Sequence, residues 1–289
     1  MNWPETSSTL ARARAEEPFE FAARDGILRG IFTPPAPESR DEGICIVFPG
    51  HPRFGVQRFP VLAARQLAAE GFSALRFDLH GHGESSGATA IATREEPYGD
   101  DVRCAVDAMW ARGHRQFLLV GYCFDALSAF SAFGDHPESI RGLLIAAPPV
   151  LERSSIGKSV TQSDNPGGLL QRVRTALGRR SEGDAREGYA SFATEVSTQL
   201  PKIAERFAAG FDELVRSSAQ ALFLYGKNDP LYLEFQVVER QLLEPLAPKD
   251  KARITVEVSP ELTHAWEGRR LLERTIAWAR GFRSSKQPR

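Results

Sequence analysis

The chain has 289 residues, a formal net charge of −1, and hydrophobic and charged contents of 42% and 25%, which are ordinary values for a globular protein. A chain of this length can bury one large core, with or without an inserted lid, and its near-zero net charge gives no electrostatic basis for binding nucleic acid. Its three cysteines form neither a CxxC pair nor a disulfide framework, so we expect no structural zinc site, no metal or cofactor, and a reducing, cytoplasmic environment.

Strands and helices are predicted to alternate along the first half of the chain. Residues 1–17 are rich in charge and lack the apolar segment of a secretory signal, so we expect a flexible N-terminal arm. No run of about 18 apolar residues follows, and we expect no membrane partner. The first core segment, 18–147, is predicted to contain a hairpin over 19–33, strands over 44–48, 73–77, 116–120 and 142–147, and helices over 59–70, 100–112 and 124–133.

The same alternation returns in a second core segment, 219–289. Two strands and two helices are predicted there, over 221–225, 254–258, 231–243 and 266–283. Strands separated by helices favour a mostly parallel sheet covered on both faces, which is an α/β fold. The interval between the two core segments, 148–218, has no strand-like apolar run, and its apolar residues from Leu169 to Leu177 follow a helical spacing. We therefore expect a helical cap inserted between two core strands.

The most informative stretch is the apolar strand that runs into Gly121, Tyr122 and Cys123 just before a predicted helix. A nucleophile elbow has this layout: a strand, a sharp turn that carries the nucleophile, and a helix whose N-terminus favours negative charge. Gly121 fits the small residue that the crowded turn needs, whereas Asp125, two residues after the thiol, departs from the usual pattern. We predict that Cys123 is a nucleophile; the alternative is a buried core cysteine.

A thiol nucleophile needs a base, and the base needs an orienting carboxylate. Of the six histidines, only His264 follows the last predicted strand, which places its loop at the sheet edge that carries the elbow. Asp229 follows the strand over 221–225, so the chain order is nucleophile, acid, histidine, as is typical of this architecture. The alternative role for Asp229 is to cap the helix that begins near Pro230.

An oxyanion hole needs two backbone N–H donors. Phe124 is expected to supply one because it follows the nucleophile. His51, in the loop after the strand over 44–48, is expected to supply the other, since the proline beside it has no N–H; the alternative is that this loop is a plain turn. Asp125 and Trp266 are predicted to contact substrate, although Trp266 also suits packing of the last helix.

Together these motifs resemble the α/β-hydrolase superfamily over nearly the whole span from Phe19 to Phe282. The resemblance is carried by Pro49-Gly50-His51, Asp78 to Ser85, Gly121 to Asp125, Gly226 to Asp229, and His264. The stretch from Arg53 to Phe59, with the cysteine elbow, is similar to hydrolases associated with exosortase systems. The elbow is also similar to that of dienelactone hydrolases, which lack a comparable cap, and the chain looks like thioesterases and acyl-handling enzymes of polyketide pathways. The resemblance implies a cysteine-nucleophile branch of the superfamily.

A cysteine nucleophile indicates chemistry on activated acyl groups. The acyl-enzyme formed on a thiol is itself a thioester, so its formation from a thioester or activated ester is nearly balanced, whereas its formation from an amide is uphill. We therefore predict a hydrolase or acyltransferase that acts on a thioester, lactone or activated ester through Cys123, Asp229 and His264, with a covalent acyl-enzyme.

Two other classes of function stay open. One is a lyase of a polyketide-type pathway, in which His264 removes a proton while an acyloxy or hydroxyl group leaves and no acyl-enzyme forms. The other, a non-catalytic binding module, is disfavoured because competent residues fill all three triad positions.

The expected partner is a small acyl substrate, free or linked to coenzyme A or a carrier protein. Between residues 153 and 180 the predicted cap carries Asp164 and six basic residues, Arg153, Lys158, Arg172, Arg174, Arg179 and Arg180. These cations fit the docking of an acidic carrier protein or its phosphorylated pantetheine arm. They also fit a solvated helix face, which is the interpretation that we favour.

Overall fold

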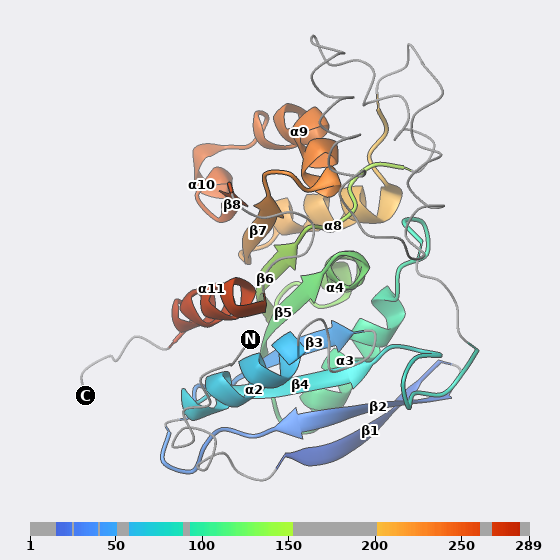
Figure 1. The fold of residues 1–289 in the computed structure, drawn as a ribbon, viewed down its shortest axis with the longest axis vertical. Helices are drawn as coiled ribbons and strands as arrows, with labels where there is room; N and C mark the ends of the chain where they lie inside the picture. The colour runs from blue at the N-terminus through green and yellow to red at the C-terminus, as the bar shows by residue number, and fades with distance from the viewer. Residues whose placement is uncertain are drawn as a thin grey trace.

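The computed structural model describes residues 16–24, 26–39, 41–50, 58–88, 93–152, 201–260 and 268–283. They form an eight-stranded sheet with the strand order β1-β2-β4-β3-β5-β6-β7-β8 (Figure 1). The strands are β1 (Glu17–Ala23), β2 (Gly26–Thr33), β3 (Ile44–Gly50), β4 (Ser73–Asp78), β5 (Gln116–Tyr122), β6 (Ile140–Ala146), β7 (Gln220–Gly226) and β8 (Ile254–Ser259). β2 pairs antiparallel with β1 and β4, and every pair from β4 to β8 is parallel.

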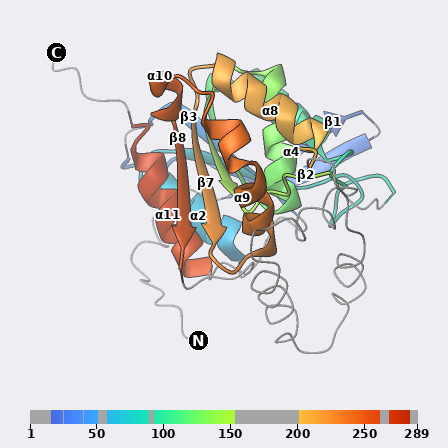
Figure 2. The ribbon, with the colours of Figure 1, turned by 90° about the horizontal axis from the view of Figure 1, so that it is seen from above.

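Helices cover both faces of this sheet, as Figure 2 shows for α2 and α11 on one side and α4 and α8 on the other. The helices are α2 (Phe59–Ala69), α3 (Gly99–Ala111), α4 (Phe124–Ala132), α8 (Glu205–Arg216), α9 (Pro230–Leu243), α10 (Pro248–Lys251) and α11 (Gly268–Arg280), with a 3₁₀ turn η2 (Phe133–Asp135). Neighbouring residues of β5 belong to different apolar clusters on the two faces of the sheet. Leu118 packs in the cluster with α2 and α11, and Leu119 packs in the cluster with α3 and α4. Central strands buried on both faces explain the unbroken apolar runs of the sequence.

The predicted α/β fold with a mostly parallel sheet is confirmed. The predicted hairpin, strands and helices of the two core segments correspond to observed elements whose ends lie within a few residues of the prediction. The short helix α10 is an addition to the predicted order.

The interval predicted as a cap, 148–218, is described only at its two ends, and residues 153–200 with the six basic side chains lie outside the described residues. The two ends run antiparallel beside each other. Leu151 bridges Ile203, and the N–H of Ala204 donates to the carbonyl of Val150 at 2.8 Å. The helix that follows, α8, packs against α4 within the main apolar cluster, so it belongs to the helix layer of the core.

The arm predicted over 1–17 is described from Glu16 onward, and these last two residues differ from the prediction of a flexible arm. Glu17 begins β1, while Glu16 is bound by two arginines. Its carboxylate accepts a hydrogen bond from Arg65 Nη2 at 2.8 Å and pairs with Nη2 of the buried Arg76 at 3.0 Å. Burial raises the pKa of Glu16, but the hydrogen bonds and charges of Arg65 and Arg76 together outweigh it, so the pKa lies below its ordinary value.

At Gly121, β5 approaches α4 so closely that no side chain fits. A Cβ at this position would lie 2.5 Å from the Cα and 2.6 Å from the backbone N of Ala126. Glycine is therefore required where the strand turns into the helix, two residues before Cys123.

We predict that Glu16→Gln lowers the free energy of unfolding near neutral pH by about 1–3 kcal/mol, since it removes a charged partner of the buried Arg76. The folded-state pKa of Glu16 is below its unfolded value. Its contribution is therefore fully present above the unfolded pKa and is lost as the pH falls through the folded pKa. Urea unfolding near neutral pH and in acid measures the difference in the free energy of unfolding between variant and wild type. This difference should disappear in acid. Glu20→Gln, whose partner Arg29 is exposed, is the control, with an expected change under about 0.5 kcal/mol.

We also predict that Gly121→Ala destabilises the protein by roughly 1–3 kcal/mol or more, because the added Cβ forces β5 and α4 apart. Gly134→Ala is the matched control, since the nearest heavy atom to a Cβ there is Cγ of Glu213 at 3.9 Å. Thermal and urea unfolding of the two variants measure the difference. Equal stability of both variants would contradict the close approach at Gly121.

Candidate active site

The carboxyl ends of β3 to β8 meet at one edge of the sheet, and the loops there carry the candidate residues. The pairs of residues in register at this edge are Gly50 with Asp78, Tyr122 with Ala146, and Gly226 with Ser259. Cys123 directly follows β5, and Asp229 follows β7. Only β6 separates these two strands, so at an interstrand spacing of about 4.8 Å the two strand ends lie about 10 Å apart. That gap suits an imidazole that bridges a carboxylate and a thiol.

Cys123 has a strained backbone with φ 56° and ψ −122°, a conformation that is rare for a residue with a side chain. It is the N-cap of α4, and its carbonyl accepts the N–H of Leu127 at 3.2 Å. Its own N–H donates to the carbonyl of Ala146 at 2.8 Å, which continues the pairing of β5 with β6 through the turn. This strand, strained turn and helix have the geometry of a nucleophile elbow.

The other two thiols have different surroundings. Cys45 is fully buried in β3, and burial raises its pKa far above the ordinary value. Cys104 lies on α3, and burial raises its pKa as well, with nearby carboxylates adding to the effect and the charge of Arg103 opposing it. Cys123 is half-buried, as Cys104 is, but it lies in the turn at the edge where the loops meet, which is the placement that a nucleophile needs.

Phe124 and Asp125 form the first turn of α4. The N–H of Phe124 is one of the four at a helix N-terminus that intrahelical bonds leave unused, as an oxyanion-hole donor requires. Asp125 is half-buried, and its carboxylate stands where the helix dipole favours negative charge. This gives Asp125 a structural role in helix α4 that is independent of its predicted contact with substrate.

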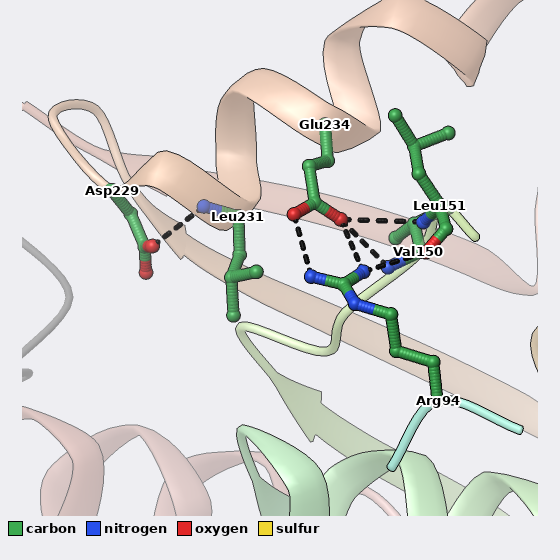
Figure 3. Close-up of polar contacts among 6 residues, drawn as sticks. All are labelled: Arg94, Val150, Leu151, Asp229, Leu231 and Glu234. Carbon is green, nitrogen blue, oxygen red and sulfur yellow. Dashed lines mark hydrogen bonds and ion pairs between the residues drawn. The ribbon is translucent and has the colours of Figure 1, made fainter. Parts of the chain in front are cut away.

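Asp229 is completely buried between β7 and α9. It caps α9: its Oδ1 accepts the N–H of Leu231 at 2.9 Å, with Pro230 as the first helical residue (Figure 3). The N-cap role proposed as an alternative is therefore real. A helix cap does not by itself exclude a second role for a carboxylate, which has two oxygens that accept hydrogen bonds.

His51, His264 and Trp266 lie outside the described residues. The described chain leads into their segments from the carboxyl ends of β3 and β8, at the same edge as the elbow. The structure thus places Cys123 and Asp229 at one edge, and the roles of the three outside residues stay predictions.

The loop after β4 is a rigid support for this edge. The buried carboxylate of Asp78 accepts the N–H of Glu84 at 3.0 Å, and the Asp78 carbonyl accepts the hydroxyl of Ser85 at 2.6 Å. Gly83 passes against the Asp78 carboxylate with φ 52°, where a Cβ would collide with it. These hydrogen bonds show that the stretch from Asp78 to Ser85 fixes the conformation of the loop.

Sequence reasoning did not identify Arg94 and Glu234, which form a buried ion pair close to Asp229 in Figure 3. Glu234 lies on α9 and Arg94 in the loop before α3, so the pair joins residues 140 apart. No local pattern marks either residue, because only the folded chain brings them together.

Two further findings concern the described ranges. Among them, no three histidine, cysteine, aspartate or glutamate residues cluster as a metal site would require. No helix within them has the length and apolar character needed to cross a membrane.

A protein-family model described as serine aminopeptidase, S33, matches residues 42–187, just over half of the chain. No curated protein sequence matches.

Solved structures with similar folds include several hydrolases. An esterase from Pyrococcus furiosus has a TM-score of 0.59 and 16% identity, over 98% of this chain and 95% of that one. An α/β serine hydrolase without a lid from Xanthomonas campestris has a TM-score of 0.55 and 18% identity, over 94% and 96%. The esterase Est1E from Butyrivibrio proteoclasticus, with ferulic acid bound, has a TM-score of 0.56 and 16% identity, over 92% and 100%. At these identities the likeness lies in the fold.

The family match covers the elbow strand and helix, and the structural matches share the α/β-hydrolase fold that the sequence predicted. The chain therefore belongs to the serine aminopeptidase S33 family and is an enzyme of the α/β-hydrolase type, with a cysteine at the turn of its elbow.

Proposed function

We propose that the protein is a hydrolase or acyltransferase that uses Cys123 as a nucleophile on a thioester, lactone or activated ester. The observation that carries the proposal is the backbone of Cys123, which makes the strained turn between a parallel strand and a helix that a nucleophile elbow requires. Strain of this kind costs of order 1–3 kcal/mol and is typical of functional sites.

In the proposed reaction the sulfur of Cys123 attacks the acyl carbon, and His264, oriented by Asp229, takes the thiol proton and passes it to the leaving group. The N–H groups of Phe124 and His51 bind the oxyanion that develops on the acyl oxygen. Water or an acceptor alcohol or thiol then attacks the acyl-enzyme, and the proton path reverses. Buried Asp229, fixed by its cap bond, supports this scheme because an orienting acid must not move.

The substrate class follows from the thiol. Exchange between thioesters is nearly balanced in free energy, so an activated acyl donor loads Cys123 without an uphill step, whereas an amide does not. The esterases among the structural matches support ester chemistry for this fold. We propose a small acyl donor, free or linked to coenzyme A or a carrier protein.

We predict that Cys123→Ala abolishes acylation of the protein by p-nitrophenyl acetate and lowers turnover by several orders of magnitude, because the nucleophile is gone. Intact-mass spectrometry measures the acyl adduct, and release of p-nitrophenolate measures turnover. Cys104→Ala, which removes the other half-buried thiol, should be acylated as wild type is. If Cys123→Ala keeps its turnover and a hydroxyl-bearing substrate yields an alkene, the lyase with His264 as base is the correct class.

We predict that Asp229→Asn lowers the rate of acylation by roughly 10²-fold to 10⁴-fold while the thermal midpoint changes little. Asparagine caps a helix about as well as aspartate, so the variant can keep the bond to Leu231 while it loses the negative charge that is proposed to orient the base. Stopped-flow release of p-nitrophenolate and thermal unfolding separate the two effects. Wild-type acylation by the variant would mean that Asp229 is only a cap.

A further inference from the structure

Arg94 and Glu234 form a buried, bidentate ion pair beside the candidate site (Figure 3). Each residue is 8% exposed. Arg94 Nη1 donates to Oε2 of Glu234 at 2.7 Å, and Nη2 donates to Oε1 at 2.8 Å. Two parallel hydrogen bonds fix the orientation of the two groups as well as their separation.

Both ions also bind the backbone where the chain leaves β6. Oε2 of Glu234 accepts the N–H groups of Val150 and Leu151, each at 3.2 Å. Arg94 Nη1 donates to the carbonyl of Leu151 at 2.8 Å. This stretch continues β6, the strand that lies between the elbow strand and the strand of Asp229. The pair therefore fixes helix α9 to the segment that follows β6.

The loop that carries Arg94 is itself tied to the elbow helix. The N–H of Tyr98 in this loop donates to Oγ of Ser128 on α4 at 3.0 Å. The hydroxyl of Ser128 donates to the carbonyl of Phe124, in the first turn of α4, at 2.9 Å. Two hydrogen bonds thus connect the residue after Cys123 to Tyr98, four residues along the loop from Arg94.

Helix α9 links the pair to Asp229. Glu234 lies in the second turn of α9, and Asp229 is the N-cap of the same helix, bound to Leu231. A shift of α9 moves Asp229 with it, so the position of Glu234 sets the position of the acid. We propose that the Arg94–Glu234 pair is a positioning device that holds Asp229 at the distance from the elbow at which it orients the base. This inference rests on the proposed function.

Stability alone does not account for the pair. The loss of hydration of two buried ions offsets much of their attraction, and apolar replacements of buried pairs are often neutral or stabilising. What a bidentate pair adds is a fixed orientation between three chain segments that are distant in sequence: the loop of Arg94, the end of β6, and α9.

The test is a double-mutant cycle between Asp229→Asn and the paired substitution Arg94→Met with Glu234→Gln. The paired substitution leaves no buried charge without a partner, and glutamine keeps an oxygen that can accept the N–H groups of Val150 and Leu151. The readout is the rate of Cys123 acylation by p-nitrophenyl acetate, measured over a range of ester concentrations so that the rate constant and the half-saturating concentration are obtained separately. Thermal unfolding is followed in parallel.

With Asp229 present, replacing the pair should lower the acylation rate constant roughly tenfold to hundredfold, because a displacement of about 1 Å can cost about 10² in rate. The half-saturating concentration should change little. In the Asp229→Asn protein the same replacement should cost less than about twofold, because residues that act through one another are not additive. Equal losses in both proteins, or no loss in either, would overturn the inference.

Two further variants complete the test. Arg240→Met with Glu244→Gln removes an exposed ion pair from the C-terminal end of α9 and should leave the acylation rate at the wild-type value. Arg94→Lys keeps the buried charge and loses the second hydrogen bond of the fork; it should show a smaller loss with the same dependence on Asp229. If the paired substitution does not fold, Arg94→Lys takes its place in the cycle. Equal losses of rate for Arg94→Lys with and without Asp229→Asn would also overturn the inference.

The two proposals fail in distinguishable ways. If the wild-type protein is not acylated on Cys123, or if Cys123→Ala is acylated equally fast, the proposed function is wrong. If acylation requires Cys123 and Asp229 but the cycle with Arg94 and Glu234 is additive, only the positioning role is wrong.

Discussion

The crossing of β5 and α4 at Gly121 is the constraint on which the rest of the site depends. With no Cβ at Gly121, the strand comes close enough to Ala126 for a single residue, Cys123, to reverse the chain. That residue then takes a positive φ, at a cost of order 1–3 kcal/mol. The cost is tolerated because β3 and β6 hold β5 from both sides and the ladder to β6 continues through the N–H of Cys123. The pairing of β5 with both neighbouring strands therefore holds the elbow in place.

Beyond the ends of the strands, polar groups replace the apolar core as the source of rigidity. Backbone N–H groups at Val150 and Leu151 lie past the pairing of β6, and each needs a buried partner. Glu234 accepts both, and Arg94 balances its charge. The hydrogen bonds from these two backbone groups offset part of the desolvation cost of the two ions. In the loop after β4, the buried carboxylate of Asp78 likewise accepts a backbone N–H, that of Glu84. At this edge buried carboxylates shape the loops, and Asp229 belongs to that pattern.

The core of the fold was predictable because its signals are local. Apolar runs at β3, β5 and β7 and the glycine before Cys123 each follow from a few neighbouring residues. Helix α8 carries a local signal too, since Phe207, Phe211 and Leu214 lie on one face, but placing it in the core needs its contact with α4. The Arg94–Glu234 pair has no local signal, because its partners are 140 residues apart and polar residues carry no periodicity.

Asp125 shares the end of α4 with the candidate nucleophile. The N-terminus of α4 favours nearby negative charge, and the Asp125 carboxylate lies in its first turn. Under the proposed mechanism the proton of Cys123 leaves through a base as attack begins, as it does from a serine hydroxyl. The base can take that proton only if it is held in the correct orientation, which is the role proposed for Asp229. The exact placement of this acid, and hence of α9, therefore matters for the rate of attack.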